Sequence, residues 1–329
     1  MHFSCERCGK SYPLKGLAYK CDCGGLFTLR KIGKEKVDLP VSLGEATTPL
    51  LKKEIYGARV YFKMDHMMPT GSFKDRGSVV LANMLKELGI EEVVEDSSGN
   101  AGASIAAYCS AAGIKSHIYV PEGTPQAKLK QIAAYGADIV KVPGPRENAS
   151  KAAQEAAKKT YYASHVYNPL FFEGTKSMAY EIYVQIGFPD IIFVPAGNGS
   201  LLLGAYIGFK ELGFLPRLIA VQSENCCPLY SKFYDLPAAE PKPTIAEGIA
   251  IAEPPRLDEM AAAVRESGGS VMTISDDEIR AAGEMLGHMG IYVEDTSAVV
   301  VAAARRHFKS GINNMRKVVL PLTGSGLKQ

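Results

Sequence analysis

The stretch PTGSFKDRG, residues 69–77, surrounds a single lysine with glycines, small hydroxyl residues and an Asp–Arg pair. A lysine amine that has lost its proton is a nucleophile that condenses with aldehydes, and burial favours this uncharged form. The alternative for this stretch alone is an exposed lysine at the start of a helix. Lys74 is therefore a candidate catalytic residue, and loops elsewhere in the chain decide between the two interpretations.

The loop AGNGS lies between an apolar segment, residues 190–195, and a helical pattern, residues 201–213. Its glycines let backbone amides approach an anion closely, and the dipole of the following helix favours negative charge there. The loop does not match the dinucleotide fingerprint, because Leu202 stands where a third glycine is needed. The chain also lacks a G-x4-G-K-[ST] motif. A tight turn without a ligand is the alternative.

Two further loops carry polar groups at the ends of predicted strands. SSGNAG, residues 97–102, opens a helix with two hydroxyls and an amide, a set of donors that suits a carboxylate. The alternative is that Ser98 or Asn100 only caps the helix. The turn TGSG follows the apolar segment 317–322 and contains Thr323, whose hydroxyl faces a ring nitrogen or caps a turn.

One cofactor accounts for all of these features together. Pyridoxal 5′-phosphate (PLP) carries an aldehyde for the Lys74 amine, a phosphate for the glycine loop and a ring nitrogen for Thr323. A carboxylate-binding loop beside the cofactor would then hold an amino acid. The sequence therefore predicts a PLP enzyme that acts on a small L-amino acid.

Four cysteines near the N-terminus follow the pattern C-x2-C-x12-C-x-C, as Cys5, Cys8, Cys21 and Cys23. Thiolates clustered in this way suit a tetrahedral Zn²⁺ site, and four protein ligands would leave no open position, so the zinc would be structural. The alternatives are reduced surface thiols or two disulfides, and a cytosolic chain disfavours disulfides. The pattern predicts a zinc-ribbon-like module over residues 1–35.

Beyond about residue 40, short apolar segments alternate with segments of helical periodicity. Strands are expected at residues 59–64, 91–96, 116–121, 138–144, 190–195, 217–222 and 317–322. Helices are expected at residues 78–89, 103–113, 126–137 and 201–213. This alternation predicts an α/β fold with parallel sheets covered on both faces.

The charge and hydropathy of the sequence argue against nucleic-acid-binding, membrane-spanning and secreted proteins. The formal net charge is +2, so no strong field favours nucleic acid or an anionic membrane. No apolar run reaches the ~18 residues that a membrane span needs, and the N-terminal stretch MHFSCERCGK is too polar for a signal peptide. The expectation is a cytoplasmic protein without nucleic-acid or membrane partners.

From about Gly44 to the C-terminus the chain resembles the threonine synthase branch of the fold-type II PLP enzymes, which are related to tryptophan synthase β subunits and serine/threonine ammonia-lyases. The resemblance is carried by PTGSFKDRG, SSGNAG, EGTK, PAGNGSLLLGA, TIAEGIAIAEP, YVEDTSA and TGSGLK. It implies two parallel-sheet αβα domains with the active site between them, a zinc module of the kind seen on some members, and a homodimer. The implied domains are residues 1–35 for the module, 36–78 with 162–329 for the large PLP-binding domain, and 79–161 for the small one.

The resemblance also implies roles for single residues. Lys74 would bond covalently to the cofactor and move the substrate proton, Asn100 would bind the phenolic oxygen, and Thr323 would face the pyridine nitrogen. A neutral hydroxyl partner for that nitrogen favours elimination and replacement over transamination. The substrate carboxylate is expected on Ser97, Ser98, Asn100 and Ala101, and the cofactor phosphate on the amides of Gly197, Asn198, Gly199, Ser200 and Leu201.

Three positions depart from the family pattern. Threonine synthases usually place two asparagines and an arginine toward the phosphate of O-phospho-L-homoserine, where this chain has Met68, His165 and Phe171. The loss of a guanidinium and two amides removes donors that a phosphate dianion needs, although a protonated His165 would return part of the charge. The pocket is expected to be more apolar and to favour an unphosphorylated or differently activated substrate, unless other residues hold the phosphate.

The expected reaction is that of a threonine synthase, which converts O-phospho-L-homoserine and water into L-threonine and phosphate. A serine/threonine ammonia-lyase and a cysteine or cysteate synthase-type β-replacement are the enzymatic alternatives. An amino-acid-binding protein without catalysis is a third alternative, and the intact Lys74 argues against it.

Overall fold

The structure is a computed structural model that describes residues 1–31, 38–309 and 317–328. It divides the chain into two compact units, which we call the first unit (residues 1–45 and 74–174) and the second unit (residues 46–73 and 175–329). Lys74 is the residue at which the chain enters the long segment of the first unit. The predicted boundary between residues 35 and 36 lies outside the described residues, and the three-part domain division stays a prediction.

The first unit contains a fully parallel four-stranded sheet in the order β8-β7-β6-β9. Its apolar strands are buried, as in Val93 and Val94 of β6, because helices connect each strand to the next. The strands are β6 (Glu92–Glu95), β7 (Lys115–Pro121), β8 (Asp138–Val142) and β9 (Tyr161–Tyr162). The helices are α1 (Lys74–Glu87), α2 (Asn100–Ala112), α3 (Gln126–Ala134), α4 (Arg146–Ala156) and α5 (Pro169–Thr175).

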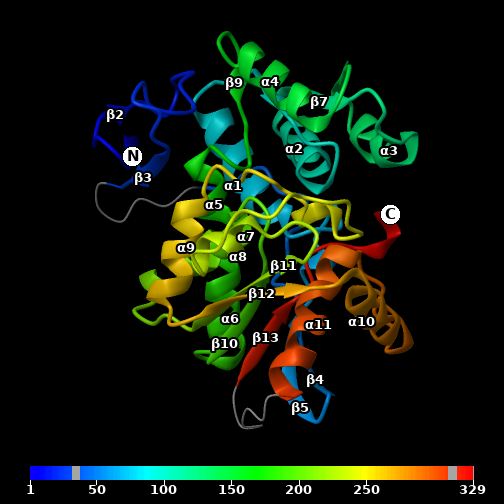
Figure 1. The fold of residues 1–329 in the computed structure, drawn as a ribbon. Coiled ribbons are helices and arrows are strands. Elements are labelled where there is room, and N and C mark those ends of the chain that lie inside the picture. Colours follow the sequence, from blue (N-terminus) through cyan, green and yellow to red (C-terminus); the bar gives the residue numbers. More distant parts are fainter. Residues whose placement is uncertain (32–37, 310–316, 329) are drawn as a thin grey trace. The chain divides into compact units, whose positions relative to one another are not determined.

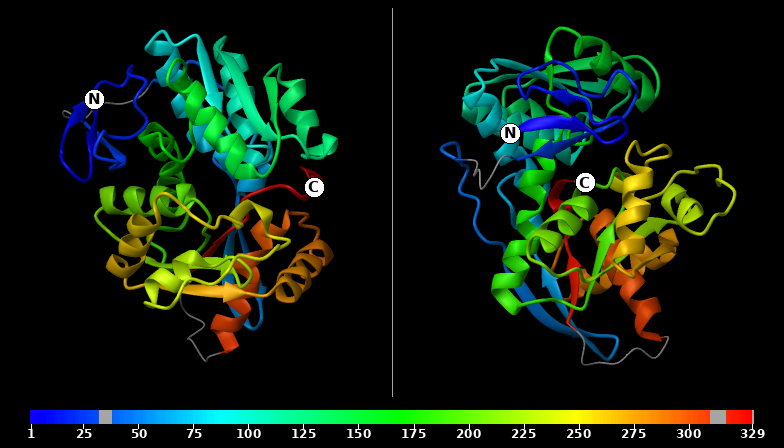
Figure 2. Two further views of the ribbon diagram at one scale, coloured as in Figure 1. Left: turned by 45° about the horizontal axis from the view of Figure 1, so that its top comes forward. Right: turned by 90° about the vertical axis from the view of Figure 1, so that its left-hand side faces the viewer.

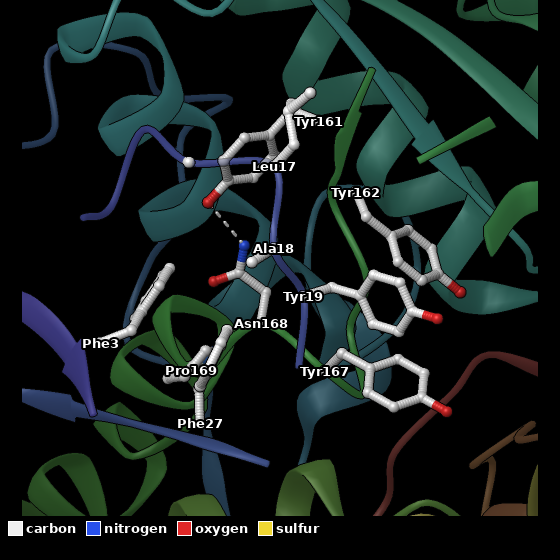
Figure 3. A pocket seen from close by; sticks show the side chains of 11 residues that line it. Phe3, Leu17, Ala18, Tyr19, Phe27, Tyr161, Tyr162, Tyr167, Asn168 and Pro169 are labelled. Carbon is white, nitrogen blue, oxygen red and sulfur yellow. Dashed lines mark hydrogen bonds between the residues drawn. The ribbon is translucent and has the colours of Figure 1, made fainter. Parts of the chain in front are cut away.

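An N-terminal module belongs to the same unit. It is a three-stranded antiparallel sheet of β1 (His2–Cys5), β2 (Ser11–Tyr12) and β3 (Phe27–Arg30) in the order β2-β1-β3, drawn in dark blue in Figure 2. The side chain of Tyr19, from the loop between β2 and β3, packs edge-on against two rings outside the module. Its ring centroid lies 5.3 Å from that of Tyr162 and 5.1 Å from that of Tyr167. These rings help to line the pocket of Figure 3, whose lining residues include no predicted substrate-binding residue.

The second unit contains a six-stranded sheet in the order β12-β11-β10-β13-β5-β4. β13 pairs in parallel with both β10 and β5, so a strand near the end of the chain lies beside one near its start (Figure 1). The strands are β4 (Leu50–Ile55), β5 (Ala58–Lys63), β10 (Ile191–Pro195), β11 (Arg217–Ser223), β12 (Ser270–Ile274) and β13 (Val318–Pro321).

The expectation of parallel sheets is wrong for one strand, β4, which is antiparallel to β5. The two strands are joined by Tyr56 and Gly57, both with positive φ (52° and 71°). Two successive positive-φ residues are typical of the tight hairpin turns that match the twist of antiparallel strands. The predicted strands and helices elsewhere are confirmed in place and type.

Helices cover the sheet of the second unit. α11 (Asp295–Lys309) is buried from Ala298 to Ala304, which explains its long run of valine and alanine. The other α-helices are α6 (Ser177–Ile186), α7 (Ser200–Glu211), α8 (Pro228–Phe233), α9 (Leu257–Glu266) and α10 (Asp276–His288), and the 3-10 helices are η1 (Asp65–Met67), η2 (Glu247–Ile249) and η3 (Gly326–Lys328). Among the described residues, no helix combines the length and apolarity needed to cross a membrane.

Candidate active site

Lys74 is the first residue of α1, and its side chain lies beside an aromatic ring. The Nζ atom is 5.9 Å from the centroid of the Phe171 ring, which is fully buried. This ring packs on the first turn of α1 so closely that a Cβ at Gly77 would come within 2.4 Å of it. Gly77 therefore permits the contact that gives the Lys74 amine an apolar neighbour.

The residues just before Lys74 are fixed to the C-terminal turn within the second unit. Ser72 forms an isolated β-bridge with Gly324, and the Phe73 amide donates to the Thr323 carbonyl at 2.9 Å. The Ser72 hydroxyl is fully buried and has no hydrogen-bond partner among the described residues. An unpartnered buried hydroxyl next to the candidate lysine is a donor available to a ligand.

Thr323 is held by a residue that the sequence reasoning did not single out. Ser297, at the start of α11, lies 3.0 Å from the Thr323 hydroxyl and accepts hydrogen bonds from the amides of Thr323 (2.9 Å) and Gly324 (2.8 Å). Ser297 is part of the motif YVEDTSA, so its presence was visible, but its partner lies 26 residues away. It fixes the orientation of the Thr323 side chain, which is 2% exposed.

The loop at residues 197–201 ends at the N-terminus of α7. Gly199 is the N-cap residue in the left-handed conformation (φ 85°), and no side chain of the described residues caps this helix. The first amides of a helix have no partner within it, so an uncapped N-terminus offers them to an anion. Gly197 brings the loop close to η2, because a Cβ there would lie 3.0 Å from the Ile249 Cα.

The loop SSGNAG, at the start of α2, also has a glycine at the N-cap position of the helix that follows it. Gly99 is the N-cap residue, so the alternative of an N-cap at Ser98 or Asn100 is wrong, and no side-chain cap is found among the described residues. The Ser97 hydroxyl accepts a hydrogen bond from the Gly99 amide at 3.3 Å. A Cβ at Gly102 would lie 1.9 Å from the Ser97 carbonyl oxygen, so only glycine permits this tight loop.

His165 and Phe171 lie together in the first unit, with ring centroids 6.1 Å apart. His165 is 5% exposed, and its Nδ1 is 2.6 Å from the Glu95 Oε1. Burial, reinforced by the positive charges of Lys74 and Arg146, holds the pKa of His165 well below its usual value. A neutral histidine supplies no positive charge, so the lowered pKa argues against a protonated His165 that returns charge for a phosphate, and the role of His165 stays a prediction.

Glu95 is a buried acid that the sequence reasoning missed. It is the last residue of β6 and is fully buried. The available signal was the pair of acids, Glu95 and Asp96, that ends an apolar strand directly before SSGNAG. Acids at the carboxyl end of a parallel strand lie where α/β sheets bind ligands.

The predicted site residues fall into two sets, one in each unit. Lys74, Ser97, Ser98, Asn100, Ala101, His165 and Phe171 belong to the first unit, and Met68, Gly197, Asn198, Gly199, Ser200, Leu201 and Thr323 belong to the second. The placement of the active site between two domains stays a prediction.

The four N-terminal cysteines lie in one cluster. Their Sγ atoms are all within 4.8 Å of one another, and all four thiols are free, so the alternative of two disulfides is wrong. Two similar turns present them, since the Gly9 amide donates to the Cys5 carbonyl (2.9 Å) and the Gly24 amide to the Cys21 carbonyl (2.8 Å). Both glycines have positive φ, 73° and 79°.

Known proteins resemble the chain along most of its length. A family model described as pyridoxal-phosphate dependent enzyme matches residues 41–324. A threonine synthase of Methanocaldococcus jannaschii is 34% identical over 373 residues, which cover 98% of this chain and 92% of that protein. Among solved structures, serine racemase from Dictyostelium discoideum has a TM-score of 0.74 at 28% identity and covers 85% of this chain and 92% of that one. A threonine deaminase from T.th. has a TM-score of 0.74 at 26% identity, with the same coverage of both chains.

Proposed function

Because the chain belongs to the pyridoxal-phosphate dependent enzyme family, we propose that it catalyses elimination or replacement at Cβ or Cγ of a small L-amino acid, as a threonine synthase-like enzyme. The observation that carries this proposal is Lys74 at the first turn of α1, next to Phe171 and directly after a segment bonded to the Thr323 turn. When bound, PLP supplies an electron sink that stabilises negative charge at Cα.

The residues present fit the cofactor. The uncapped N-terminus of α7 suits a phosphate, and the unpartnered Ser72 hydroxyl and the fixed Thr323 hydroxyl are neutral groups available to it. Lys74 would bond to the cofactor aldehyde and, once displaced by substrate, would take the Cα proton. The uncapped N-terminus of α2, with Ser97 and Ser98, would bind the substrate carboxylate and so orient the Cα–H bond toward Lys74.

O-phospho-L-homoserine is the first candidate substrate, with L-threonine and phosphate as products. Its support is family membership, since the Methanocaldococcus jannaschii relative is called a threonine synthase. The replacement of the usual donors by Met68, the neutral His165 and the buried Phe171 leaves fewer groups for a phosphate dianion.

A serine/threonine ammonia-lyase is the second candidate, and the same three residues favour it. A pocket with an apolar ring and a neutral imidazole suits an unphosphorylated side chain. The similarity in fold to a threonine deaminase supports this candidate as well. A sulfur-dependent β-replacement would require a sulfur nucleophile for turnover, and a non-catalytic binding protein would release no product.

Borohydride reduction tests the covalent role of Lys74. Reduction should fix the cofactor on the peptide that contains Lys74, and Lys74→Ala should lose both the label and the turnover. Lys130→Ala, an exposed lysine on α3, is the control and should keep both. A label on another lysine would contradict the proposal. A screen of O-phospho-L-homoserine, L-serine, L-threonine and O-phospho-L-serine for phosphate, ammonia and 2-oxo acid would separate the candidate reactions.

We also propose that Cys5, Cys8, Cys21 and Cys23 hold one structural Zn²⁺. Four ligands at tetrahedral Zn–S distances lie about 3.8 Å from one another, and the closest Sγ pairs here, Cys5–Cys23 and Cys8–Cys21, are 3.5 Å apart. The Tyr12 hydroxyl donates to the Cys21 sulfur at 3.2 Å, and a donor at this position stabilises the thiolate form that binds a metal.

Metal content tests the zinc site. Cys5→Ser should lower the bound zinc and the melting temperature without removing the cofactor label on Lys74, because the module is separate from the catalytic lysine in sequence. Cys227→Ser, outside the cluster, is the matched control and should keep the full zinc content. A zinc-free protein of unchanged stability would contradict the site.

We propose that the protein is a cytoplasmic homodimer, as the family resemblance implies. Light scattering of the cofactor-loaded protein should give twice the mass of the 35.4 kDa chain. A monomer mass at working concentration would contradict the dimer and would leave the proposed chemistry intact.

A further inference from the structure

Glu95 is a fully buried carboxyl group, and the described residues pair only one of its two oxygens. Oε1 lies 2.6 Å from the Nδ1 of His165, whereas Oε2 is buried and has no hydrogen-bond partner among the described residues. Buried polar atoms in folded proteins almost always have a hydrogen-bond partner, so the unpartnered oxygen of Glu95 is unusual. A bound substrate that supplies the missing hydrogen-bond partner would explain it.

The pair lies on the edge of the sheet where ligands bind. β6 and β9 are parallel neighbours, and Glu95 ends β6 while His165 follows β9 by three residues. The carboxyl ends of parallel strands are the ligand-binding edge of α/β sheets. In the sequence, His165 lies between Tyr162, the last residue of β9, and Tyr167, and both tyrosines are labelled in Figure 3.

A chain of contacts leads from this pair to the reactive amine. The His165 ring lies edge-on to Phe171, with centroids 6.1 Å apart, and the Nζ of Lys74 lies 5.9 Å from the same Phe171 ring. Two residues after Glu95 comes Ser97, the first residue of the loop proposed to bind the substrate carboxylate. Glu95, Ser97 and Lys74 therefore all lie in the first unit, and the charge of Lys74 acts on the Glu95 carboxyl group.

The charges around the pair decide where its protons reside. Burial, followed by the negative charge of Asp96, raises the pKa of Glu95 well above its usual value, and Lys74, the His165 amide and Arg146 oppose this less strongly. Burial, Lys74 and Arg146 keep His165 neutral. Asp96 itself accepts a hydrogen bond from the Tyr162 hydroxyl at 2.5 Å. The pair thus consists of a carboxylic acid and a neutral imidazole.

We propose that Glu95 is a general acid whose Oε2 proton is delivered to a departing hydroxyl group, and that His165 is the positioning residue that donates to Oε1 and leaves Oε2 free. The substrate class is then an L-amino acid with an unmodified hydroxyl on Cβ. This inference rests on the proposed PLP chemistry, specifies which leaving group the site takes, and so favours the second candidate reaction, that of a serine/threonine ammonia-lyase, over the first. A hydroxyl needs a proton in order to leave, whereas a phosphate leaves as a stable anion without one.

The proton balance closes within the first unit. Lys74 takes the Cα proton, and the electron pair of the Cα–H bond forms the Cα–Cβ double bond. The Cβ–O bond breaks, its electron pair stays on oxygen, and the Oε2 proton of Glu95 converts the departing group into water. Lys74 then holds one extra proton and Glu95 lacks one, so a transfer between them resets both groups.

A comparison of leaving groups on the unaltered holoenzyme is the first test. L-serine and L-threonine should release ammonia and a 2-oxo acid, and β-chloro-L-alanine, whose chloride needs no proton, should do the same. Turnover of β-chloro-L-alanine or O-phospho-L-homoserine without turnover of serine or threonine would overturn the role of Glu95 and leave the PLP proposal standing. No turnover of any of these compounds, with no label on Lys74, would refute the PLP proposal instead.

Glu95→Gln is the second test. Loss of a general acid should lower kcat on L-serine by about 10²- to 10⁴-fold while the rate on β-chloro-L-alanine changes little. Glu92→Gln removes an exposed acid from the same strand and is the matched control, with both rates unchanged. His165→Gln should lower the serine rate less than Glu95→Gln and shift its pH profile. Equal losses on both substrates in Glu95→Gln would overturn the proposal.

A spectroscopic readout keeps the test independent of activity. A difference infrared spectrum between the unaltered protein and Glu95→Gln should contain the carbonyl stretch of a protonated carboxylic acid at neutral pH. If Glu95→Gln fails to fold, the spectrum of Glu95→Asp serves instead, with a shifted acid band expected. Only carboxylate bands in these spectra would overturn the assignment of Glu95 as an acid.

Discussion

Glu181 of the second unit and Glu95 of the first are both largely removed from water, but their oxygens are satisfied in opposite ways. Glu181 forms an ion pair with Lys63 at 2.5 Å, and Lys63, which is fully buried, also donates to the Thr48 carbonyl (2.8 Å) and to Gln185 (3.0 Å). Glu95 instead faces a neutral imidazole and keeps one oxygen without a partner among the described residues.

This difference distinguishes an acid that stabilises the fold from an acid that is available for catalysis. In the Lys63–Glu181 pair the chain itself supplies an opposite charge, so the pair needs nothing from outside. At Glu95 the described residues pair one carboxyl oxygen and leave the other without a hydrogen-bond partner. The same contrast recurs at helix N-termini, because a capping box of Ser275 and Glu278 satisfies α10, whereas α2 and α7 have no side-chain cap.

The largest change in the free energy of unfolding is expected at the Lys63–Glu181 ion pair, where the chain supplies both charges. Lys63→Met removes the positive charge that Lys63 presents to Glu181 and should lower the free energy of unfolding by about 3 kcal/mol, with turnover per folded molecule unchanged. Urea titration followed by circular dichroism measures the loss. Lys210→Met, which breaks the exposed pair with Glu266, is the control and should change little.

A second substitution sharpens this expectation. Adding Glu181→Leu to Lys63→Met removes both members of the pair and should recover part of the lost stability, because no uncompensated charge remains. If the losses of unfolding free energy from the two substitutions simply add in the double variant, the two side chains are not coupled. Glu181 would then not be an acid that is stabilised by its own partner in the chain, and the contrast with Glu95 would fail.

An intermediate effect is expected from the dependence of stability on pH. The raised pKa of Glu95 means that the folded chain keeps a proton that the unfolded chain releases above about pH 4.3, so stability falls as the pH rises. The slope is at most about 1.4 kcal/mol per pH unit until Glu95 ionises in the folded state. Glu95→Gln abolishes this contribution and should gain stability relative to the unaltered protein as the pH rises above about 4.3.

His165 contributes with the opposite sign and is present in both proteins. Its lowered pKa means that the unfolded chain binds the proton more readily, so its contribution to stability rises with pH up to about 6.5. The charges of Asp96, Lys74 and Arg146 are also common to both proteins. Parallel curves of unfolding free energy against pH would show that Glu95 is ionised in the folded state and would remove its contrast with Glu181.

The smallest effect is expected at the capped helix. Ser275→Ala removes the side chain that accepts from the Glu278 amide and should cost about 1 kcal/mol of stability, without loss of the cofactor label on Lys74. Thermal unfolding and borohydride labelling measure the two quantities. A lost label would mean that the cap of α10 serves the cofactor, and the division between satisfied and open helix termini would fail.

The sequence predicted most of the parallel framework because each buried strand is a short apolar run and each loop has local turn chemistry. It also located Lys74 and the loops at residues 97–102, 197–201 and 323–326, since their glycines and hydroxyls are contiguous. β4 was not predicted, because in its sequence Leu50–Ile55 three charged residues stand in a row and the apolar residues do not alternate with polar ones.

The contacts that define the candidate site could not be predicted from local sequence patterns. Glu95 meets His165 across 70 residues, and Lys63 meets Glu181 across 118. No spacing rule connects such pairs, because they arise from the order of strands in the sheets. The same reason hid the role of Ser297 beside Thr323, although both residues lie in motifs that were visible.

The central place of β13 in the six-stranded sheet has a consequence for biosynthesis. β5 emerges from the ribosome roughly 250 residues before β13, its neighbour, and at 5–20 residues per second this delay is roughly 12–50 s. During that time the β4–β5 hairpin has an unpaired edge, which on its own is marginally stable and open to association with other chains. Nascent chains of this protein are therefore expected to depend on holding chaperones while the sheet of the first unit, whose strands span residues 92–162, is already able to form.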